Sequence, residues 1–407
     1  MISLLWWEGA FAFAYDTLVG PVYISGLAGE VGISIWLVSL LTSLPWLGQS
    51  GQLVGAFFFG RVQSLKKYTL VLAALSRSLW LLPLVTAGWF GFSQYAWGVA
   101  FPVRGWFVFV SVIACLSTLA GHASLVGWLS WMKAVIPSNF QGRFFGGRQR
   151  YYMAALILAN LAAAAWVGWK PGGYRTGYAV VCLLALMAAL LSTLFLARVP
   201  DAVRFETQRP FLESVMEPLR DAGFRRVILF GTVFQGAVLL AGTYFPYYFT
   251  KELGIPMSYI AVWAMLANLG NALSSAFWGR MVDRSGNPGR AIFLGGIMMA
   301  CSPLLYIIPS AKVVMTLGLA EAFMSGVAWA GYNLAMTTLI FKTCPKGRNA
   351  AYFGVYAACS GIAGAACIFI GGALAKGLVA YGGFRALWLV ASAARFAVIL
   401  TLGRALR

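Results

Sequence analysis

The sequence predicts an all-α integral membrane protein with twelve transmembrane helices in two pseudo-symmetric six-helix bundles. Of its 407 residues, 61% are hydrophobic and only 10% are charged, and the mean hydropathy is +0.80. About 25% of the residues of a soluble globular domain are charged, so this chain is too apolar to be one. The apolar residues also gather in runs of about 20, the length that a helix needs to cross a bilayer.

Twelve such runs follow one another along the chain. They cover Leu4–Ala28, Ile33–Phe59, Tyr68–Thr86, Gly105–Val135, Tyr151–Trp169, Gly177–Ala197, Val227–Phe249, Met257–Trp278, Ala291–Ile308, Val313–Phe341, Ala350–Ala375 and Phe384–Leu402. We expect a kink in the first run at Gly20-Pro21, because proline removes a helix hydrogen bond. An even number of spans places both termini on one side of the membrane.

The basic residues are divided unevenly between the segments that connect these runs. If both termini are cytoplasmic, the inner segments hold 21 Lys and Arg, the outer segments hold 7, and Arg77 and Arg395 lie within spans, which accounts for all 30 basic residues. Cytoplasmic loops of membrane proteins are typically enriched in Lys and Arg. We therefore predict cytoplasmic termini, and we attribute the net charge of +19 to membrane topology and not to nucleic-acid binding.

Charged residues return in the middle of the chain, between Arg198 and Arg226. Pro210 there precedes a short stretch whose apolar residues share one helical face, namely Phe211, Leu212, Val215, Met216 and Leu219. This pattern predicts an amphipathic cytoplasmic linker at the membrane surface. The predicted domains are an N-terminal bundle over residues 1–198, the linker over 199–226 and a C-terminal bundle over 227–407.

Short turn motifs recur at matching places in the two halves. Gly60-Arg61 after the second span corresponds to Gly279-Arg280 after the eighth. After the fourth and the tenth spans, the matching residues are Pro137, Gly142-Arg143 and Phe144 in the first half and Pro345, Gly347-Arg348 and Phe353 in the second. This repetition indicates two parallel six-helix repeats.

The charged segment from Gly279 to Arg290 has the sequence Gly-Arg-Met-Val-Asp-Arg-Ser-Gly-Asn-Pro-Gly-Arg. It resembles the loop signature G-x-x-x-D-R-x-G of the major facilitator superfamily. The resemblance implies a conformational role for Gly279, Asp283, Arg284, Gly286 and Arg290, with the glycine letting two helices close and the aspartate facing a helix end or an arginine. A generic basic cytoplasmic turn is the alternative. In the first-half copy Ser64 replaces the aspartate, so we expect that contact only at Asp283.

Three ionisable residues lie deep within the predicted spans: Asp16 in the first, His122 in the fourth and Glu321 in the tenth. Ionisable side chains at membrane depth are costly and usually face a cavity or a partner. The resemblance implies that the first, fourth, seventh and tenth helices line a central cavity. We therefore predict that these three residues take part in proton coupling.

Each of the three residues has a structural alternative. Asp16 could be a buried carboxylate held by Ser, Thr or Arg, and Glu321 could hydrogen-bond across helices. His122 could be a satisfied core histidine or the proton partner of Asp16. We favour the coupling role for Asp16, because a carboxylate removed from water binds a proton more readily.

The remaining charges within spans lead to different expectations. Glu8 precedes Asp16 by about 12 Å along a helix axis, so we interpret it as a gate at the cytoplasmic edge, with snorkelling to the interface as the alternative. Arg77 and Arg395 lie in the third and twelfth spans, which the resemblance implies are peripheral. We expect buried structural pairs there, and an anionic substrate would become attractive if either arginine faced the cavity.

Neutral residues complete the predicted substrate cavity. They are Trp128, Gln235, Tyr244, Tyr332 and Asn333. Small residues in the second, fifth, eighth and eleventh spans, such as Gly51, Gly270 and Gly361, permit close helix contact, and we expect these helices between the two halves.

The resemblance implies a secondary transporter that moves a small solute by alternating access in a bacterial inner membrane, with protons as the coupling ion. We expect a monomer within the lipid bilayer, without a cofactor or a metal, since the chain has one histidine and no Cys-x-x-Cys pair. An uncoupled uniporter and a lipid-modifying membrane enzyme with His122 as its base are the alternatives. A receptor or scaffold that has lost transport would tolerate apolar replacement of the polar mid-depth residues. No substrate can be assigned from the sequence.

Overall fold

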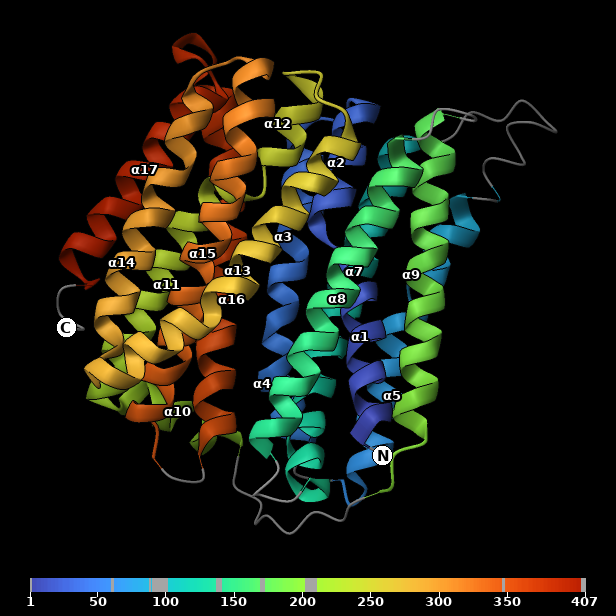
Figure 1. Cartoon of the computed structure of the whole chain (residues 1–407), viewed down its shortest axis with the longest axis vertical. Helices are drawn as coiled ribbons and strands as arrows, with labels where there is room; N and C mark the ends of the chain where they lie inside the picture. The colour runs from blue at the N-terminus through green and yellow to red at the C-terminus, as the bar shows by residue number, and fades with distance from the viewer. Residues whose placement is uncertain are drawn as a thin grey trace.

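The structure is a computed structural model that describes residues 2–59, 62–87, 89, 102–136, 141–168, 173–201, 211–345 and 348–403. Over these residues the chain is almost entirely helical, with long helices running roughly side by side (Figure 1). The prediction of an all-α membrane fold with two six-helix bundles is confirmed. Nine helical segments among the described residues are long and apolar enough to cross a membrane. The first, second and fifth spans complete the set of twelve.

In the first half, six spans are built from the following helices. They are α1 (Ile2–Leu18) with α2 (Pro21–Val31), α3 (Ile35–Leu47) with η1 (Gly48–Ser50) and α4 (Gly51–Phe59), α5 (Leu65–Ser78), α7 (Val103–Val135), α8 (Gln141–Gly168) and α9 (Gly173–Ala197). The predicted break at Gly20-Pro21 is confirmed, because α2 begins with Pro21 and Gly20 precedes it in an extended conformation. The fifth span begins at Gln141, ten residues before its predicted start, which brings Arg148 into a helix.

The second half begins with the linker helix. Its elements are α10 (Phe211–Arg220), α11 (Ala222–Gly242) with α12 (Phe245–Lys251), α13 (Met257–Ser285), α14 (Pro288–Cys301) with η3 (Ser302–Ile307), α15 (Ala311–Thr343), α16 (Asn349–Gly377), η4 (Val379–Tyr381) and α17 (Phe384–Thr401). The linker helix α10 packs against α11 and α16, and its Glu217 forms an ion pair with Arg348. The part of the predicted linker that follows residue 210 is therefore attached to the second half, while residues 202–210 lie outside the described residues.

The two halves meet through the four spans predicted for this contact. Helix α8 packs against α13, and α3 and α4 pack against α16. The predicted role of the glycines needs a correction, because most of them face their own half. A Cβ atom on Gly51 would collide with Leu119 of α7, and one on Gly270 would collide with Phe323 of α15. Gly361 does face the other half, where it contacts the backbone of Trp46.

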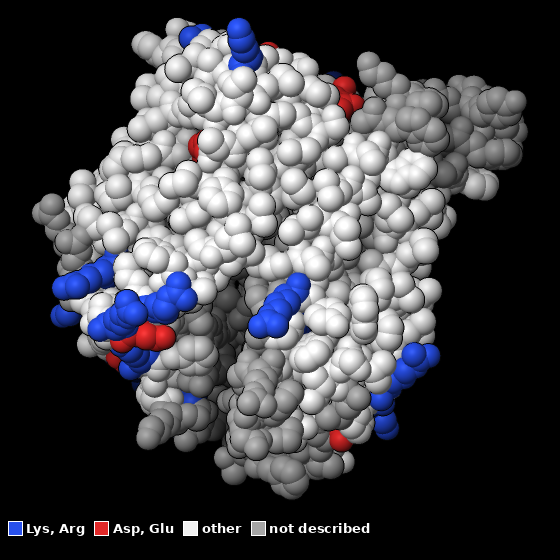
Figure 2. Space-filling view, viewed as in Figure 1, with Lys and Arg blue, Asp and Glu red and all other residues white. Residues whose placement is uncertain are grey.

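The two ends of the molecule differ in how the halves meet. At the end where α2 packs against α12, the Tyr244 hydroxyl lies 2.7 Å from Ser39 Oγ, and the Tyr247 hydroxyl donates a hydrogen bond to the Ile33 carbonyl at 2.9 Å. The opposite end carries the chain's N-terminus and α10 (Figure 1), and we call it the linker end. Figure 2 shows a hollow between the two halves over the lower part of the view, towards the linker end.

Candidate functional site

The larger cavity, which we call the first-half cavity, has a volume of about 560 Å³. Its walls come mainly from α1, α3, α5 and α7, and Asp16, His122 and Trp128 line it as predicted. Arg77 and Arg148 line it as well. Two of the predicted coupling residues and one predicted substrate contact are thus brought together in a single cavity.

Glu8 is the centre of a charged cluster on the wall of this cavity. Only 2% of its surface is exposed, and its carboxylate lies 3.3 Å from Arg148 Nη2 and 3.8 Å from Arg77 Nη2. Ser192 Oγ donates a further hydrogen bond to Glu8 Oε1 at 3.2 Å. A carboxylate with these partners does not snorkel to the interface, so that alternative is excluded. Its predicted function as a gate stays a prediction.

Arg148 is the cavity residue that the sequence analysis did not predict, because the basic residues between the fourth and fifth spans were assigned to a cytoplasmic loop. In the structure it lies on α8, where its guanidinium is 4.3 Å from the centre of the Trp128 ring and 5.3 Å from that of Phe13. Such cation–π contacts hold a guanidinium in place without neutralising it. The helical spacing of Phe144, Arg148 and Tyr151 was the signal for an earlier start of α8.

Asp16 differs from Glu8 in its surroundings. It is exposed to the first-half cavity and makes no hydrogen bond or ion pair with the residues that the structure describes. It interacts electrostatically with Arg77, Glu8 and Arg148. The ring of His122, its predicted proton partner, pairs instead with Gln52, with Nδ1 3.2 Å from Gln52 Nε2.

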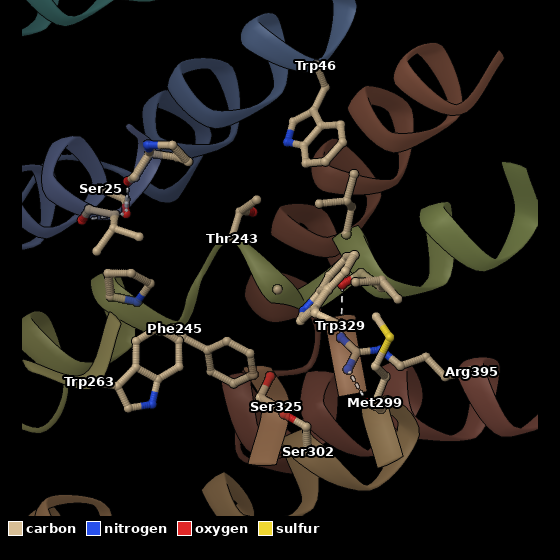
Figure 3. A pocket seen from close by; sticks show the side chains of 16 residues that line it. Ser25, Trp46, Thr243, Phe245, Trp263, Met299, Ser302, Ser325, Trp329 and Arg395 are labelled. Carbon is tan, nitrogen blue, oxygen red and sulfur yellow. Dashed lines mark hydrogen bonds between the residues drawn. The ribbon is translucent and has the colours of Figure 1, made fainter. Parts of the chain in front are cut away.

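A smaller cavity of about 230 Å³, the second-half cavity, lies beside the first. Pro21 and Trp46 line both cavities. Figure 3 shows aromatic side chains around the smaller one, including Phe245, Trp263 and Trp329. Among the described residues, one charged residue lines this cavity, whereas four charged residues line its neighbour.

Arg395 is the charged residue among those that line the second-half cavity. It is 3% exposed, and its guanidinium donates to the carbonyl oxygens of Ala237, Val238 and Met299 at 3.3, 2.9 and 2.7 Å. The bonds to Ala237 and Val238 hold α11 at a point shortly before it ends at Gly242. We expected a buried pair with another side chain, and the structure shows backbone carbonyls as the partners instead.

Glu321 lies behind the wall of the second-half cavity and does not line it. Its carboxylate accepts hydrogen bonds from Ser302 and Tyr306 of η3, and the Tyr306 hydroxyl also accepts from Trp263 Nε1 at 3.1 Å. Cross-helix hydrogen bonding, one of the two interpretations of Glu321, is thus present. Its participation in proton coupling stays a prediction.

Four of the five predicted substrate contacts line neither cavity. Tyr244 is buried, and its hydroxyl lies 2.7 Å from Ser39 Oγ of the other half and donates to the Ile368 carbonyl of its own half at 2.6 Å, so it serves the contact between the halves. Tyr332 packs against Phe234, with ring centres 4.9 Å apart, and Gln235 is buried. Asn333 is exposed one turn beyond Trp329 on α15. Helical periodicity did not predict these orientations, because apolar residues surround the spans on all sides.

The motif after the eighth span forms a compact turn. Gly286 ends α13 in the left-handed conformation with φ +63°, and Lys342 Nζ donates to its carbonyl at 2.5 Å. Asp283, Arg284 and Arg290 are exposed, and Asp283 forms no ion pair with a described residue. A Cβ atom on Gly279 would lie 3.9 Å from Leu334, so close helix contact does not require glycine there.

The corresponding turn in the first half is held by different contacts. Ser64 precedes α5, its Oγ accepts from the Lys67 amide at 3.0 Å and donates to Asp201 Oδ2 at 2.5 Å. Asp201 Oδ1 accepts from the Lys66 amide at 3.0 Å. The carboxylate that the motif lacks at Ser64 is thus supplied by Asp201 at the start of the linker. Gly60-Arg61, Pro137 and Gly347 of the predicted repeats lie outside the described residues.

The described residues do not bring three His, Cys, Asp or Glu side chains close enough to hold a metal ion.

Comparison with solved structures finds the same fold in several transporters. A bacterial homologue of the iron transporter ferroportin in an inward-facing state has a TM-score of 0.74 at 14% identity, with 98% of this chain and 97% of that chain covered. The D-xylose-proton symporter has a TM-score of 0.70 at 15% identity, covering 98% and 96%. The nucleoside transporter NupG has a TM-score of 0.73 at 11% identity, with 100% of each chain covered.

No curated protein matches the sequence. The family model described as Major Facilitator Superfamily matches residues 5–368, which is most of the chain and includes both halves. The match and the shared fold also exclude the membrane-enzyme alternative. This chain therefore belongs to the Major Facilitator Superfamily and is a multi-pass membrane transporter.

Proposed function

We propose that this protein is a secondary active transporter that moves a small solute by alternating access and couples transport to protons through Asp16. The observation that carries the proposal is the position of Asp16, an exposed carboxylate inside a cavity of about 560 Å³ between a closed end and a hollowed end of the molecule. A change in its protonation alters the charge of the cavity and so biases one closed state over the other.

Two observations support an inward-facing state. The cross-half bonds of Tyr244 and Tyr247 join the halves at the α2–α12 end, while the hollow in Figure 2 lies towards the linker end. The ferroportin homologue is also more similar in its inward-facing state, with a TM-score of 0.74, than in its outward-facing state, with 0.69. The linker end would then be cytoplasmic, as the distribution of basic residues predicts. We further propose a monomer in a bacterial inner membrane.

Distances between spin labels test this function without a known substrate. In a background free of native cysteines, one pair at Lys67 and Arg284 reports the linker end, and a second pair at Glu30 and Lys312 reports the other end. We expect lowering the pH from 8 to 6 to change the two distances in opposite directions, because protonation of Asp16 shifts the equilibrium. Asp16→Asn should abolish this response, whereas Glu252→Gln, an exposed carboxylate outside both cavities, should preserve it.

The outcomes separate coupling from transport. Distances that respond to pH equally in the parent and in Asp16→Asn would move coupling to another group, for which Glu321 is the next candidate. Opposite changes that occur without any pH dependence would favour the uncoupled uniporter. Distances fixed under every condition, including saturation with a metabolite library, would contradict alternating access.

A further inference from the structure

We propose that the substrate is an amphiphilic organic anion, with an acidic group that binds in the first-half cavity and an apolar body that extends into the second-half cavity. This inference rests on the proposed transport function and specifies its substrate class. It follows from the contact between the two cavities, from their different linings and from the balance of charge around them.

The two cavities adjoin at one wall. Trp46 of α3 and Pro21 of α2 line both of them. In Figure 3, Trp46 reaches from its helix towards the second-half cavity, opposite Phe245 and Trp263. A solute that passes Trp46 therefore contacts both halves at once, as a transporter needs if binding is to influence their relative position.

The described residues that line the cavities carry an excess of positive charge. These lining residues include three arginines, Arg77, Arg148 and Arg395, and two carboxylates, Glu8 and Asp16. One positive charge remains when Asp16 is ionised and two remain when it is neutral. An organic cation would meet this excess unfavourably, whereas an anion lowers it.

The acidic group of the substrate fits the first-half cavity better than the second. Arg395 already donates to three backbone carbonyls, which leaves it poorly placed for a ligand. In the first-half cavity Glu8 is only 2% exposed and is held by Arg77, Arg148 and Ser192. The second arginine is therefore not matched by a buried carboxylate, and Arg148 Nε is buried without a hydrogen-bond partner among the residues that the structure describes.

The apolar body of the substrate fits the second-half cavity. Its lining includes Phe245, Trp263 and Trp329, together with Val238, Leu239 and Met299. Aromatic walls with few polar groups are typical of sites for the apolar part of a small ligand. The volume of about 230 Å³ limits that part to a single ring or a short chain.

Protonation of Asp16 links this anion to the proton. The titratable or charged groups that interact with Asp16 or share its cavity come from four helices: Glu8 and Tyr15 of α1, Arg77 of α5, His122 of α7, and Arg148 and Tyr152 of α8. Among these, Asp16 is the carboxylate that lacks a described hydrogen-bond partner. Its neutral form adds one unit to the positive excess, so a monovalent anion and a proton favour each other's binding. Their joint movement would carry no net charge.

The test measures binding of matched probes by the rise in melting temperature of the purified protein. The probes share a phenylpropyl body and differ in their head: 3-phenylpropane-1-sulfonate is an anion at pH 6 and at pH 8, 3-phenylpropyltrimethylammonium is a cation, and 3-phenylpropanol is neutral. Methanesulfonate provides the acidic head without the body. We expect the aromatic sulfonate to bind at least about tenfold more tightly than each of the others.

The pH dependence should follow the charge of Asp16, because the sulfonate itself does not titrate. We expect binding to be about fivefold tighter at pH 6 than at pH 8. Asp16→Asn should bind with the same affinity at both pH values, close to that of the parent at pH 6. Sulfonate binding that keeps its pH dependence in Asp16→Asn would overturn the link to this carboxylate.

Variants of the two cavities locate the head and the body. Arg77→Gln should weaken sulfonate binding about tenfold, and Arg225→Gln, an exposed arginine of α11, should leave it unchanged. Since Arg148→Gln alone would remove the nearer of the two arginines that hold Glu8, the double variant Glu8→Gln/Arg148→Gln removes the ion pair as a whole and should also weaken binding. Trp329→Ala should weaken the phenylpropyl sulfonate and leave methanesulfonate unchanged.

Three results would overturn the assignment: preference for the ammonium probe, equal binding of the alcohol and the sulfonate, or no saturable response to the sulfonate. Each can occur while the spin-label distances still show pH-dependent alternation, in which case the proposed function stands and the substrate class fails. Sulfonate binding with fixed distances would be the opposite result, an anion site in a protein that does not alternate.

Discussion

Arg77 and Arg395 were both predicted to lie in peripheral spans, and the structure gives them different hydrogen-bond partners. Arg77 shares Glu8 with Arg148 and donates to Thr193 Oγ1 at 2.8 Å, on the wall of the first-half cavity. Arg395 has backbone carbonyls as its hydrogen-bond partners. The third and the twelfth spans are not counterparts in the six-helix repeat, and their arginines differ in chemistry: Arg77 belongs to an ion-pair cluster, whereas Arg395 binds backbone carbonyls.

This difference has a consequence for stability and for function. The three carbonyls bound by Arg395 belong to α11 and α14, close to where α11 ends at Gly242 and α14 continues as η3. The Met299 carbonyl needs a new donor, because the residue four positions on is Pro303, which has no N–H, and no water replaces it in a membrane. Arg395 therefore holds the broken spans of the second half, whereas the first-half cluster is open to changes in charge.

Removal of Arg395 should cause the largest loss in the free energy of unfolding. Arg395→Met keeps much of the volume and removes three hydrogen bonds from a charged donor, each worth about 1.5 to 3 kcal/mol. We expect a loss of at least about 3 kcal/mol in the free energy of unfolding, measured by denaturation in mixed micelles, with Arg395→Lys recovering part of it. Arg385→Gln, an exposed arginine of the same helix, is the control. A stable Arg395→Met variant would show that other donors replace the guanidinium.

Substitution of Glu8 in the first-half cluster should lower the free energy of unfolding by less, because the side chains around it can adjust to one another. Glu8→Gln leaves two arginines without their common carboxylate, and breaking a buried ion pair on one side costs about 3 kcal/mol or more. Since both arginines line a cavity, we expect about 2 kcal/mol here. Glu8→Gln/Arg148→Gln should recover part of this loss, which a double-mutant cycle measures. Equal losses in Glu8→Gln and in the double variant would mean that Arg77 alone matters.

The fold was predictable from the sequence to a greater extent than the site. Hydropathy runs, the charge bias and Gly20-Pro21 predicted the spans and one of their breaks, because the membrane forces long apolar helices on any sequence. Asp16 was found for the same reason, since a carboxylate at that depth requires an explanation. These features depend on local amino-acid composition, which can be read directly from the sequence.

The positions that the sequence did not predict depend on rotation about a helix axis and on where helices end. Tyr244 and Tyr332 lie in spans that do face the centre, but their side chains point to helix contacts. Arg148 was missed because a charged residue at the end of an apolar run looks the same in a loop and in the first turns of a helix. Asp201 was missed because the residue that completes the first-half turn lies more than a hundred positions away in the sequence.

The loops at the ends of the second and the eighth spans should give the smallest changes in the free energy of unfolding. Asp201 accepts from Ser64 and from the Lys66 amide at the start of α5, while the motif residue Asp283 is exposed without an ion pair among the described residues. An amide in place of Asp201 keeps one acceptor and loses the charge at the positive end of the helix. Asp201→Asn should therefore lower the free energy of unfolding by about 1 kcal/mol, whereas Asp283→Asn should change it by less than about 0.5 kcal/mol. Denaturation of both variants under the same conditions checks this order, and a larger loss in Asp283→Asn would show that the second-half carboxylate closes a contact in another state of the transport cycle.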